Sequence, residues 1–313
     1  MPPVVTQSDR VTISVACFRA NRYVRRAVES LLAQTHPALT LVVLSDGDPD
    51  PPWRELESIG DPRLVRFSLT ENHGPYFAHQ VALAASDTPY FMVHDADDWS
   101  APDRVATLVK ALTADRSDLA FSAWQQYREG ADGVARKDSI RWRRRLPSDL
   151  PARPGGPTPE PFLFDPMLTE DFLNRATHHG IFRREALQNI GGCFGGFRMN
   201  YDTLLTNLVL MTGKVSFIEE PLYHYTIRPD SLSHGAATGA RSQARTAAKA
   251  QQEALYREAF RCYKQWMKGE LGSGNFLSQV RELTGRFVTP RDRATLASET
   301  ARLTEILHSR TSR

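Results

Sequence analysis

The sequence predicts an α/β fold: a Rossmann-like, mixed and mainly parallel sheet flanked by helices, followed by a helical C-terminal extension. Three features favour this class. Apolar strand-like runs alternate with helix-like stretches between residues 11 and 113, the connections are short, and acidic clusters follow two of the runs. Such alternation is typical of parallel sheets with helices on both faces. These sheets bind ligands at the carboxyl ends of their strands, so the acidic clusters mark the expected site.

The first part of the chain alternates strands and helices regularly. The apolar run over 11–18 indicates a buried strand, and apolar residues then recur at helical spacing as far as Leu32. Further strands are expected at 41–44, 64–69, 90–93 and 118–124, and helices at about 75–86 and 101–113.

A proline-rich stretch then interrupts the pattern. Residues 147–161 contain six prolines and two glycines, which indicates a loop. We expect 141–166 to be a mobile lid or acceptor loop, because gating loops arise beside strand-end clefts. The basic run Arg141–Arg145 stands at its start, either as a solvated face or as a contact for donor phosphates or an anionic acceptor.

Regular structure returns after residue 178. The expected elements are strands at 178–183, 214–218 and 222–227, a helix at 202–212, a long helix at 241–268 and two further helices. The sequence Thr289-Pro290-Arg291-Asp292 predicts a helix start. We therefore predict a catalytic domain over 1–235, with a donor half at about 11–125 and an acceptor half at 167–235, and a helical region over 236–313.

Composition excludes several classes of protein. The 313 residues carry 39 Lys plus Arg against 36 Asp plus Glu, a net charge of +3 that gives no reason to expect nucleic acid as a partner. The three cysteines are far apart, which argues against a disulfide framework or a structural zinc site. No apolar run reaches the roughly 18–20 residues of a membrane span, and the N-terminus lacks a signal-peptide core. We expect a cytoplasmic protein.

The strongest chemical signal is Asp95-Ala96-Asp97-Asp98, directly after an apolar run. Three carboxylates within four residues repel one another unless a positive charge lies among them, so a divalent cation such as Mn²⁺ or Mg²⁺ is favoured. Such ions complete their shell with water and substrate phosphate, which indicates a phosphate-bearing substrate. The alternative is helix capping by Ser100 and Asp103, which leaves Asp95 and Asp97 without a role.

A second acidic cluster, Asp46-Gly47-Asp48, follows the second predicted strand. A carboxylate there can accept the N3–H of uracil or thymine. Asp-Gly is also a common turn dipeptide, and the cluster by itself favours neither interpretation.

Five segments, taken in order, resemble the inverting glycosyltransferases of family 2, which have a GT-A fold. They are SVACFRANRYVRRAVESLLAQTHP, VVLSDGDPD, NHGPYFAHQVALAASDTPYFMVHDADDW, FRREALQNIGGCFGGFRMNYDTLL and EPLYHYTIRPDSLS. The resemblance runs from about Val11 to Ser233. Each segment alone is a weak or moderate signal, and their shared order carries the assignment.

The resemblance assigns roles to individual positions. Asp46 matches the acid that contacts the nucleobase, and Ala16 matches the strand end that touches it. Asp95 and Asp97 match the Asp-x-Asp pair: Asp97 is the expected metal ligand, and Asp95 is expected to face the donor sugar or ribose. Asp202 matches the carboxylate that acts as general base on the acceptor.

Other positions match the segment around the diphosphate, with departures from the family pattern. The stretch from Tyr223 through Arg228 and Ser231 matches the part that closes over the diphosphate. Relatives often carry Ala-Arg-Asn where this chain has Ala78-His79-Gln80, so His79 stands where a fixed positive charge is usual. Arg228 stands where many relatives have His and could supply that charge.

Two further histidines, His178 and His179, are expected on a strand near the acceptor side. A hydrogen-bonding role is favoured for them over a catalytic one.

The resemblance implies a metal-dependent inverting enzyme that moves a sugar from a nucleotide-diphosphate donor, with UDP or dTDP favoured, to a hydroxyl or other nucleophile. Mn²⁺ or Mg²⁺ at Asp97 would neutralise the leaving group, and Asp202 would take the acceptor's proton. A nucleotidyltransferase and a non-catalytic nucleotide-sugar-binding protein are the alternatives. The acceptor class stays open among small molecules, glycans, lipid carriers and proteins.

Overall fold

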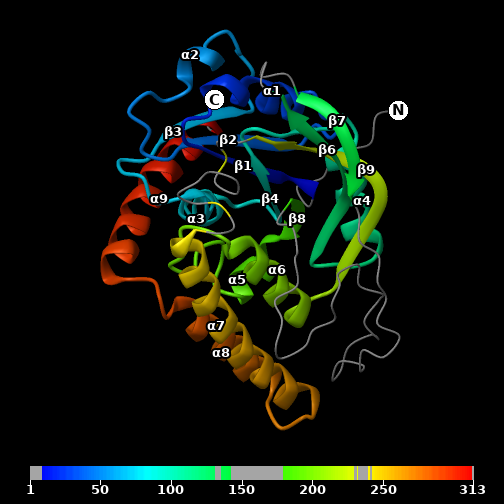
Figure 1. Ribbon diagram of the computed structural model, residues 1–313, viewed down its shortest axis with the longest axis vertical. Helices are drawn as coiled ribbons and strands as arrows, with labels where there is room; N and C mark the ends of the chain where they lie inside the picture. Colours follow the sequence, from blue (N-terminus) through cyan, green and yellow to red (C-terminus); the bar gives the residue numbers. More distant parts are fainter. Residues whose placement is uncertain are drawn as a thin grey trace.

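The computed structural model describes residues 9–130, 135–141, 179–228, 231, 239 and 242–311, which form one sheet with helices on both faces (Figure 1). The strand order is β3-β2-β1-β4-β8-β6-β9-β5, with β7 beside β6. The first four of these strands run parallel, whereas β8 is antiparallel to both β4 and β6. The predicted mixed, mainly parallel sheet flanked by helices is therefore confirmed.

The parallel half follows the predicted order closely. Its elements are β1 (Val11–Cys17), α1 (Asn21–Leu32), β2 (Leu39–Ser45), α2 (Trp53–Leu56), β3 (Leu64–Ser68), α3 (Pro75–Ala85) and β4 (Tyr90–Asp95). In the β-sheet register Ala16 of β1 lies beside Leu44 of β2 on one side and Asp95 of β4 on the other. The ends of these three strands, and the acids that follow them, therefore meet at one edge of the sheet.

The strands of the parallel half are apolar on both faces because helices cover both. On one face, buried residues of the strands pack with α1 and α4 (Arg104–Ala114), and on the other they pack with α3 and the helices of the second half. Alternate side chains of a strand point to opposite faces, so a strand covered twice needs an unbroken apolar run. This is why the runs in the sequence located these strands correctly.

The second half contains both longer and shorter strands than the sequence predicts. Its elements are β5 (Trp99–Ser100), β6 (Leu119–Glu129), β7 (Ala135–Arg141), β8 (Gly180–Arg183), α5 (Arg184–Asn189), α6 (Tyr201–Thr212) and β9 (Val215–Ile227). The predicted lid at 141–166 lies outside the described residues, apart from Arg141 at the end of β7. His178 lies outside them as well.

The two strands predicted at 214–218 and 222–227 form one continuous strand, β9. The register against β6 passes from Ser122 opposite Ile218 to Ala123 opposite Pro221, so β9 advances three residues where β6 advances one. Pro221 cannot donate a ladder hydrogen bond, and it stands at this irregularity, where such residues are tolerated. The strand therefore continues through the proline, with a change of register, instead of ending there.

The alternative capping role of Ser100 and Asp103 is wrong. Ser100 belongs to β5, and Asp103, the residue before α4, makes no side-chain capping bond. Gln34 caps α4 instead: its Oε1 accepts a hydrogen bond from Val105 N at 2.9 Å, and its Nε2 donates to Ala101 O at 2.7 Å. The end of α1 thus supplies the acceptor that the start of α4 needs.

The C-terminal helices are α7 (Gln243–Met267), α8 (Ser273–Gly285) and α9 (Pro290–Thr311). One face of α7 is buried and includes Leu255, Ala259, Tyr263 and Trp266. The Trp266 ring stacks on Phe276 of α8 with the centroids 4.8 Å apart. Thr289 and Asp292 form the predicted capping box, with Asp292 N donating to Thr289 Oγ1 at 3.1 Å. Buried residues of all three helices belong to the same core cluster as α3 and α6. Among the helices that the structure describes, none has the length and apolarity that a bilayer crossing needs.

The last helix also holds the loop between β3 and α3. Figure 1 shows α9 running beside that part of the molecule. Glu299, which is 2% exposed, accepts hydrogen bonds at Oε1 from Thr70 N at 3.1 Å and from Thr70 Oγ1 at 2.7 Å. Arg291 of the same helix pairs with Glu71 at 2.8 Å. A hydrogen-bonded and ionic contact thus joins the C-terminal region to the loop between β3 and α3.

Replacing Glu299 by Ala should therefore lower the free energy of unfolding by about 1–3 kcal/mol, because it leaves the amide of Thr70 without its acceptor. Urea unfolding followed by circular dichroism measures the change. Glu305→Ala, an exposed change on the same helix, is the control and should stay within about 0.5 kcal/mol of wild type. Equal stability of the two variants would contradict a structural role for Glu299.

Candidate active site

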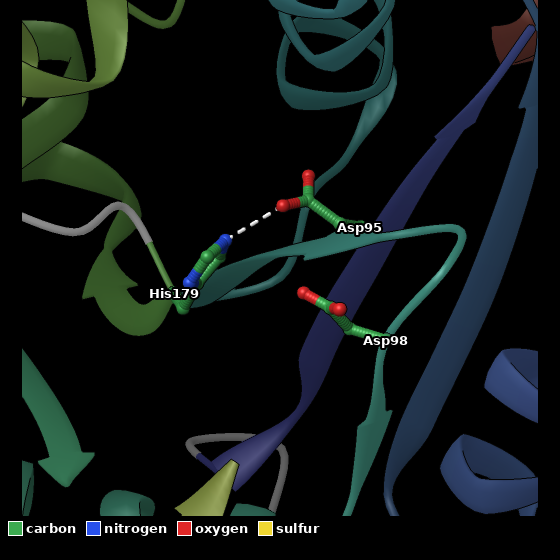
Figure 2. Close-up of side chains that lie close together, drawn as sticks. All are labelled: Asp95, Asp98 and His179. Atoms are coloured by element: carbon green, nitrogen blue, oxygen red, sulfur yellow. Dashed lines mark hydrogen bonds and ion pairs between the residues drawn. The ribbon is translucent and has the colours of Figure 1, made fainter. Parts of the chain in front are cut away.

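Asp95, Asp97 and Asp98 form an acidic edge at the end of β4, and Asp95 is its first residue. Its Oδ2 lies 2.7 Å from Nε2 of His179, which stands directly before β8 (Figure 2). The His179 ring stacks on Tyr223 of β9 with the centroids 4.3 Å apart, and its carbonyl accepts a hydrogen bond from Arg104 Nη2 at 2.8 Å. His179 is therefore a hydrogen-bonding residue, as the sequence favoured, and it orients a carboxylate of the Asp-x-Asp pair.

Asp97 pairs with Arg228, which follows β9. The Arg228 Nε donates to Asp97 Oδ2 at 2.6 Å, and both side chains are largely buried. The guanidinium also lies over the ring of Tyr23, 4.7 Å from its centroid. Burial raises the pKa of Asp97, whereas the charge of Arg228 lowers it. Arg228 thus brings a positive charge to the acidic edge.

Asp98 connects this edge to β9 through hydrogen bonds. It is fully buried: Tyr223 OH donates to its Oδ2, and Thr226 N donates to its Oδ1 at 2.6 Å. Burial and the charges of Asp97 and Asp95 raise the pKa of Asp98 well above its ordinary range. Such a site tolerates a carboxylate only because hydrogen-bond donors surround it.

Behind the acidic edge lies a buried polar chain that sequence reasoning missed. Arg104 Nη1 donates to Ser100 Oγ at 2.9 Å, which lies 3.1 Å from His94 Nε2, and His94 Nδ1 lies 2.8 Å from Asp95 O. The network fits a neutral His94 that accepts from Ser100 and donates to the carbonyl. Two features of the sequence could have indicated this chain. His94 is a polar residue inside an apolar strand, and Arg104 is the first residue of a helix.

Asp46 joins the end of β2 to the start of α3. It is 2% exposed, and its two carboxylate oxygens accept hydrogen bonds from His73 N at 2.9 Å and Gly74 N at 2.8 Å. Gly47, with φ +61°, lies so close to this loop that a Cβ would come within 2.2 Å of Asn72 N. Asp46 therefore shapes the turn, as the turn interpretation expects, and its contact with a nucleobase stays a prediction.

His79 lies deeper than its expected contact with the diphosphate requires. The side chain is 1% exposed on α3, and its Nδ1 is 2.9 Å from Ser14 Oγ on β1. A histidine held between a helix and the central strand has a packing role. Its position gives the predicted diphosphate contact no support.

Asp202 lies in the first turn of α6, where the positive end of the helix dipole favours a carboxylate. Tyr76, in the first turn of α3, donates its hydroxyl to Asp202 Oδ1 at 2.9 Å. Burial raises the pKa of Tyr225 on β9, and the charges of Asp98, Asp95, Asp97 and Asp202 raise it further. The predicted base and the acidic edge therefore act on the same tyrosine.

Ser231, the last of the predicted donor contacts, is near Arg228. Its backbone N donates to the Arg228 carbonyl at 3.3 Å. This contact places Ser231 beside Arg228, and its contact with a donor stays a prediction.

Comparison with known proteins identifies relatives over most of the chain. Residues 12–191 match the family described as Glycosyl transferase family 2. The succinoglycan biosynthesis protein ExoO of Rhizobium meliloti is 28% identical over 236 residues, which cover 74% of this chain and 65% of that protein. The glycosyltransferase GlyA of Streptococcus pneumoniae is 25% identical over 122 residues, which cover 39% of this chain and 18% of GlyA. The chain thus spans less than two thirds of the length of these relatives.

Among solved structures, residues 1–349 of S. aureus TarS in complex with UDP-GlcNAc superpose with a TM-score of 0.56 at 15% identity. The match covers 96% of this chain and 90% of that structure. At this identity the likeness establishes the fold alone.

The buried His94 predicts a pH dependence of stability. Burial lowers the pKa of His94 to about 3, whereas in the unfolded chain it returns to about 6.5. Between these values the unfolded state binds the extra proton, so acidification favours unfolding. Between pH 7 and pH 5 wild type should lose about 2 kcal/mol of unfolding free energy more than His94→Gln, measured by urea denaturation at both pH values. An equal loss in both proteins would show that His94 is protonated in the folded state.

Proposed function

Because the chain belongs to Glycosyl transferase family 2, we propose that it transfers a sugar from a nucleotide-diphosphate donor to a nucleophilic acceptor with inversion. The observation that carries this proposal is the acidic edge at the end of β4, where His179 holds Asp95 and Arg228 pairs with Asp97. Asp202, held by Tyr76 at the start of α6, supplies a further carboxylate. Inverting transfer needs one group to neutralise the leaving diphosphate and another to accept the nucleophile's proton. Asp202 suits the second task, and the carboxylates of Asp95 and Asp97 suit the first because they can hold a divalent cation.

We propose a uridine or thymidine diphosphate sugar as the donor. The TarS structure holds UDP-GlcNAc, which supports a uridine donor in this fold. Asp46 and Ala16 are the proposed contacts for the base, at the ends of β2 and β1. Since both Asp46 oxygens already accept backbone hydrogen bonds, the base contact would use a second lone pair of the carboxylate.

The donor atoms at the end of β4 fit a divalent cation. Asp95, Asp98 and His179 each offer one ligand atom, and the three atoms lie within 4.8 Å of one another. Asp97 adds a further carboxylate, and burial together with the charges of Asp97 and Asp95 raises the pKa of Asp98. A group rich in carboxylate oxygens suits Mg²⁺ or Mn²⁺.

We expect Asp97 to be the direct ligand, with Asp95 beside it; when bound, the ion would supply charge neutralisation for the leaving diphosphate. Arg228 contributes a second positive charge, which stays fixed because a guanidinium does not deprotonate at working pH. His179 keeps the Asp95 carboxylate in one orientation through its hydrogen bond.

Asp202 is the proposed general base. As the acceptor attacks the anomeric carbon, its proton passes to the Asp202 carboxylate while the bond to the diphosphate breaks. The start of α6 favours the ionised form of this residue through the helix dipole.

Metal binding is tested by titrating EDTA-treated protein with Mn²⁺ in a calorimeter. We expect wild type to bind the ion and Asp97→Asn to bind it at least about tenfold more weakly, because the direct ligand is lost. Asp103→Asn, an exposed acid six residues further along, is the control and should bind normally. If His179→Asn lost binding while Asp97→Asn kept it, the ion would belong to Asp95, Asp98 and His179 instead.

The base is tested with Asp202→Asn, which keeps the shape of the side chain and cannot take a proton. Transfer should fall by about 10²–10⁴-fold while donor affinity stays unchanged, measured as acceptor-dependent release of nucleoside diphosphate. Glu185→Gln, an exposed acid in the first turn of α5, is the matched control. Normal transfer by folded Asp202→Asn protein would rule Asp202 out as the base.

A further inference from the structure

We propose that Tyr76 is a positioning residue for the general base: its hydroxyl fixes the rotation of the Asp202 carboxylate and so sets the direction from which that group meets the acceptor. This inference rests on the proposed role of Asp202. The two residues are 126 positions apart and come from the first turns of different helices, α3 and α6. Their contact therefore exists only in the folded protein.

The geometry of the contact is that of a charge-assisted hydrogen bond. Tyr76 OH lies 2.9 Å from Asp202 Oδ1. A hydroxyl that donates to an ionised carboxylate forms one of the stronger hydrogen bonds in proteins. A carboxylate held by one oxygen loses rotational freedom, and its other oxygen then points in a defined direction. A base must meet its proton within hydrogen-bond reach, so this direction matters for transfer.

Tyr76 can hold the carboxylate in place because its own ring is buried and packed against a second ring. The residue is 8% exposed, and its ring meets that of Tyr201 edge to face with the centroids 5.8 Å apart. Pro75 opens α3 just before it. The preceding Gly74, with φ +92°, donates its N–H to Asp46. The position of the hydroxyl is therefore set by the same loop that shapes the turn at the end of β2.

The hydroxyl remains a donor throughout the working pH range. Burial, together with the charge of Asp202, raises the pKa of Tyr76 well above its ordinary value of 10. A protonated phenol has one O–H to donate, and the structure directs it at Asp202. The contact thus keeps the same polarity in every state in which Asp202 is ionised.

The alternative is that Tyr76 only fills the core, and the sequence position next to buried Phe77 would suit that role. Tyr76→Phe separates the two, because it keeps the ring and removes only the hydroxyl. Tyr201→Phe is a matched control: it removes the neighbouring buried hydroxyl, for which the described part of the structure offers no hydrogen-bond partner.

We expect Tyr76→Phe to lower kcat by roughly 10- to 100-fold, with the KM for the donor changed less than about twofold. Tyr201→Phe should keep the wild-type kcat. Circular dichroism and nucleotide affinity verify that both variants are folded. A wild-type kcat in folded Tyr76→Phe protein, or an equal loss in Tyr201→Phe, would overturn the proposal.

A double-mutant cycle with Asp202→Asn tests whether Tyr76 acts through the base. If it does, adding Tyr76→Phe to Asp202→Asn should cause no further loss in kcat, because the group that it positions is already inactive. The same fold loss in both backgrounds would show that Tyr76 acts independently, against the proposal.

The outcomes also separate this inference from the proposed function. Normal transfer by Asp202→Asn would remove the base and the positioning role together. Loss of transfer in Asp202→Asn with a normal kcat in Tyr76→Phe would leave the base in place and refute the positioning role alone.

Discussion

The structure around the site depends on one electrostatic constraint, which is that three carboxylates within four residues are held at the buried end of β4. Asp97 and Asp98 are largely or fully shielded from water, and burial raises the pKa of both. Ionised groups in such a place need partners. The fold brings those partners from distant segments: Arg228 and Tyr223 from the region of β9, and His179 from the start of β8.

The last part of β9 supplies one of these partners, because Thr226 N donates to Asp98. The strand pairs with β6 along both of its parts, and its register changes at Pro221. Beyond it, His224 and Tyr223 pair with Trp99 and Ser100 of β5, which closes the turn containing the carboxylates.

The loop between β3 and α3 links the parts of the protein. Thr70 is held by Glu299 of the last helix, and His73 and Gly74 donate to Asp46 at the end of β2. Two residues further, Tyr76 holds Asp202. The C-terminal helices, the proposed nucleobase turn and the proposed base are therefore connected through seven consecutive residues, 70–76.

The sequence by itself determined where the parallel strands lie along the chain, the acids at their ends and the capping box at Thr289. These features arise from local patterns: an unbroken apolar run, a helical period, and polar residues at fixed short spacing. It also placed Asp46, Asp95, Asp97 and Asp202 in the segments that the structure brings to one region.

Only the tertiary structure decided what each of these polar side chains contacts. His94 and Arg104 stood out weakly in the sequence because one lies in an apolar strand and the other at a helix start, yet they form a single buried network through Ser100. Ser100 has the spacing of a capping residue, but Gln34 caps the helix and leaves Ser100 to that network. His79 forms a hydrogen bond with Ser14, and Tyr76 forms one with Asp202, which lies 126 residues further along the chain. Such pairings depend on how helices pack on the two faces of the sheet, and side-chain partners that are distant in sequence leave no periodic signal along the chain.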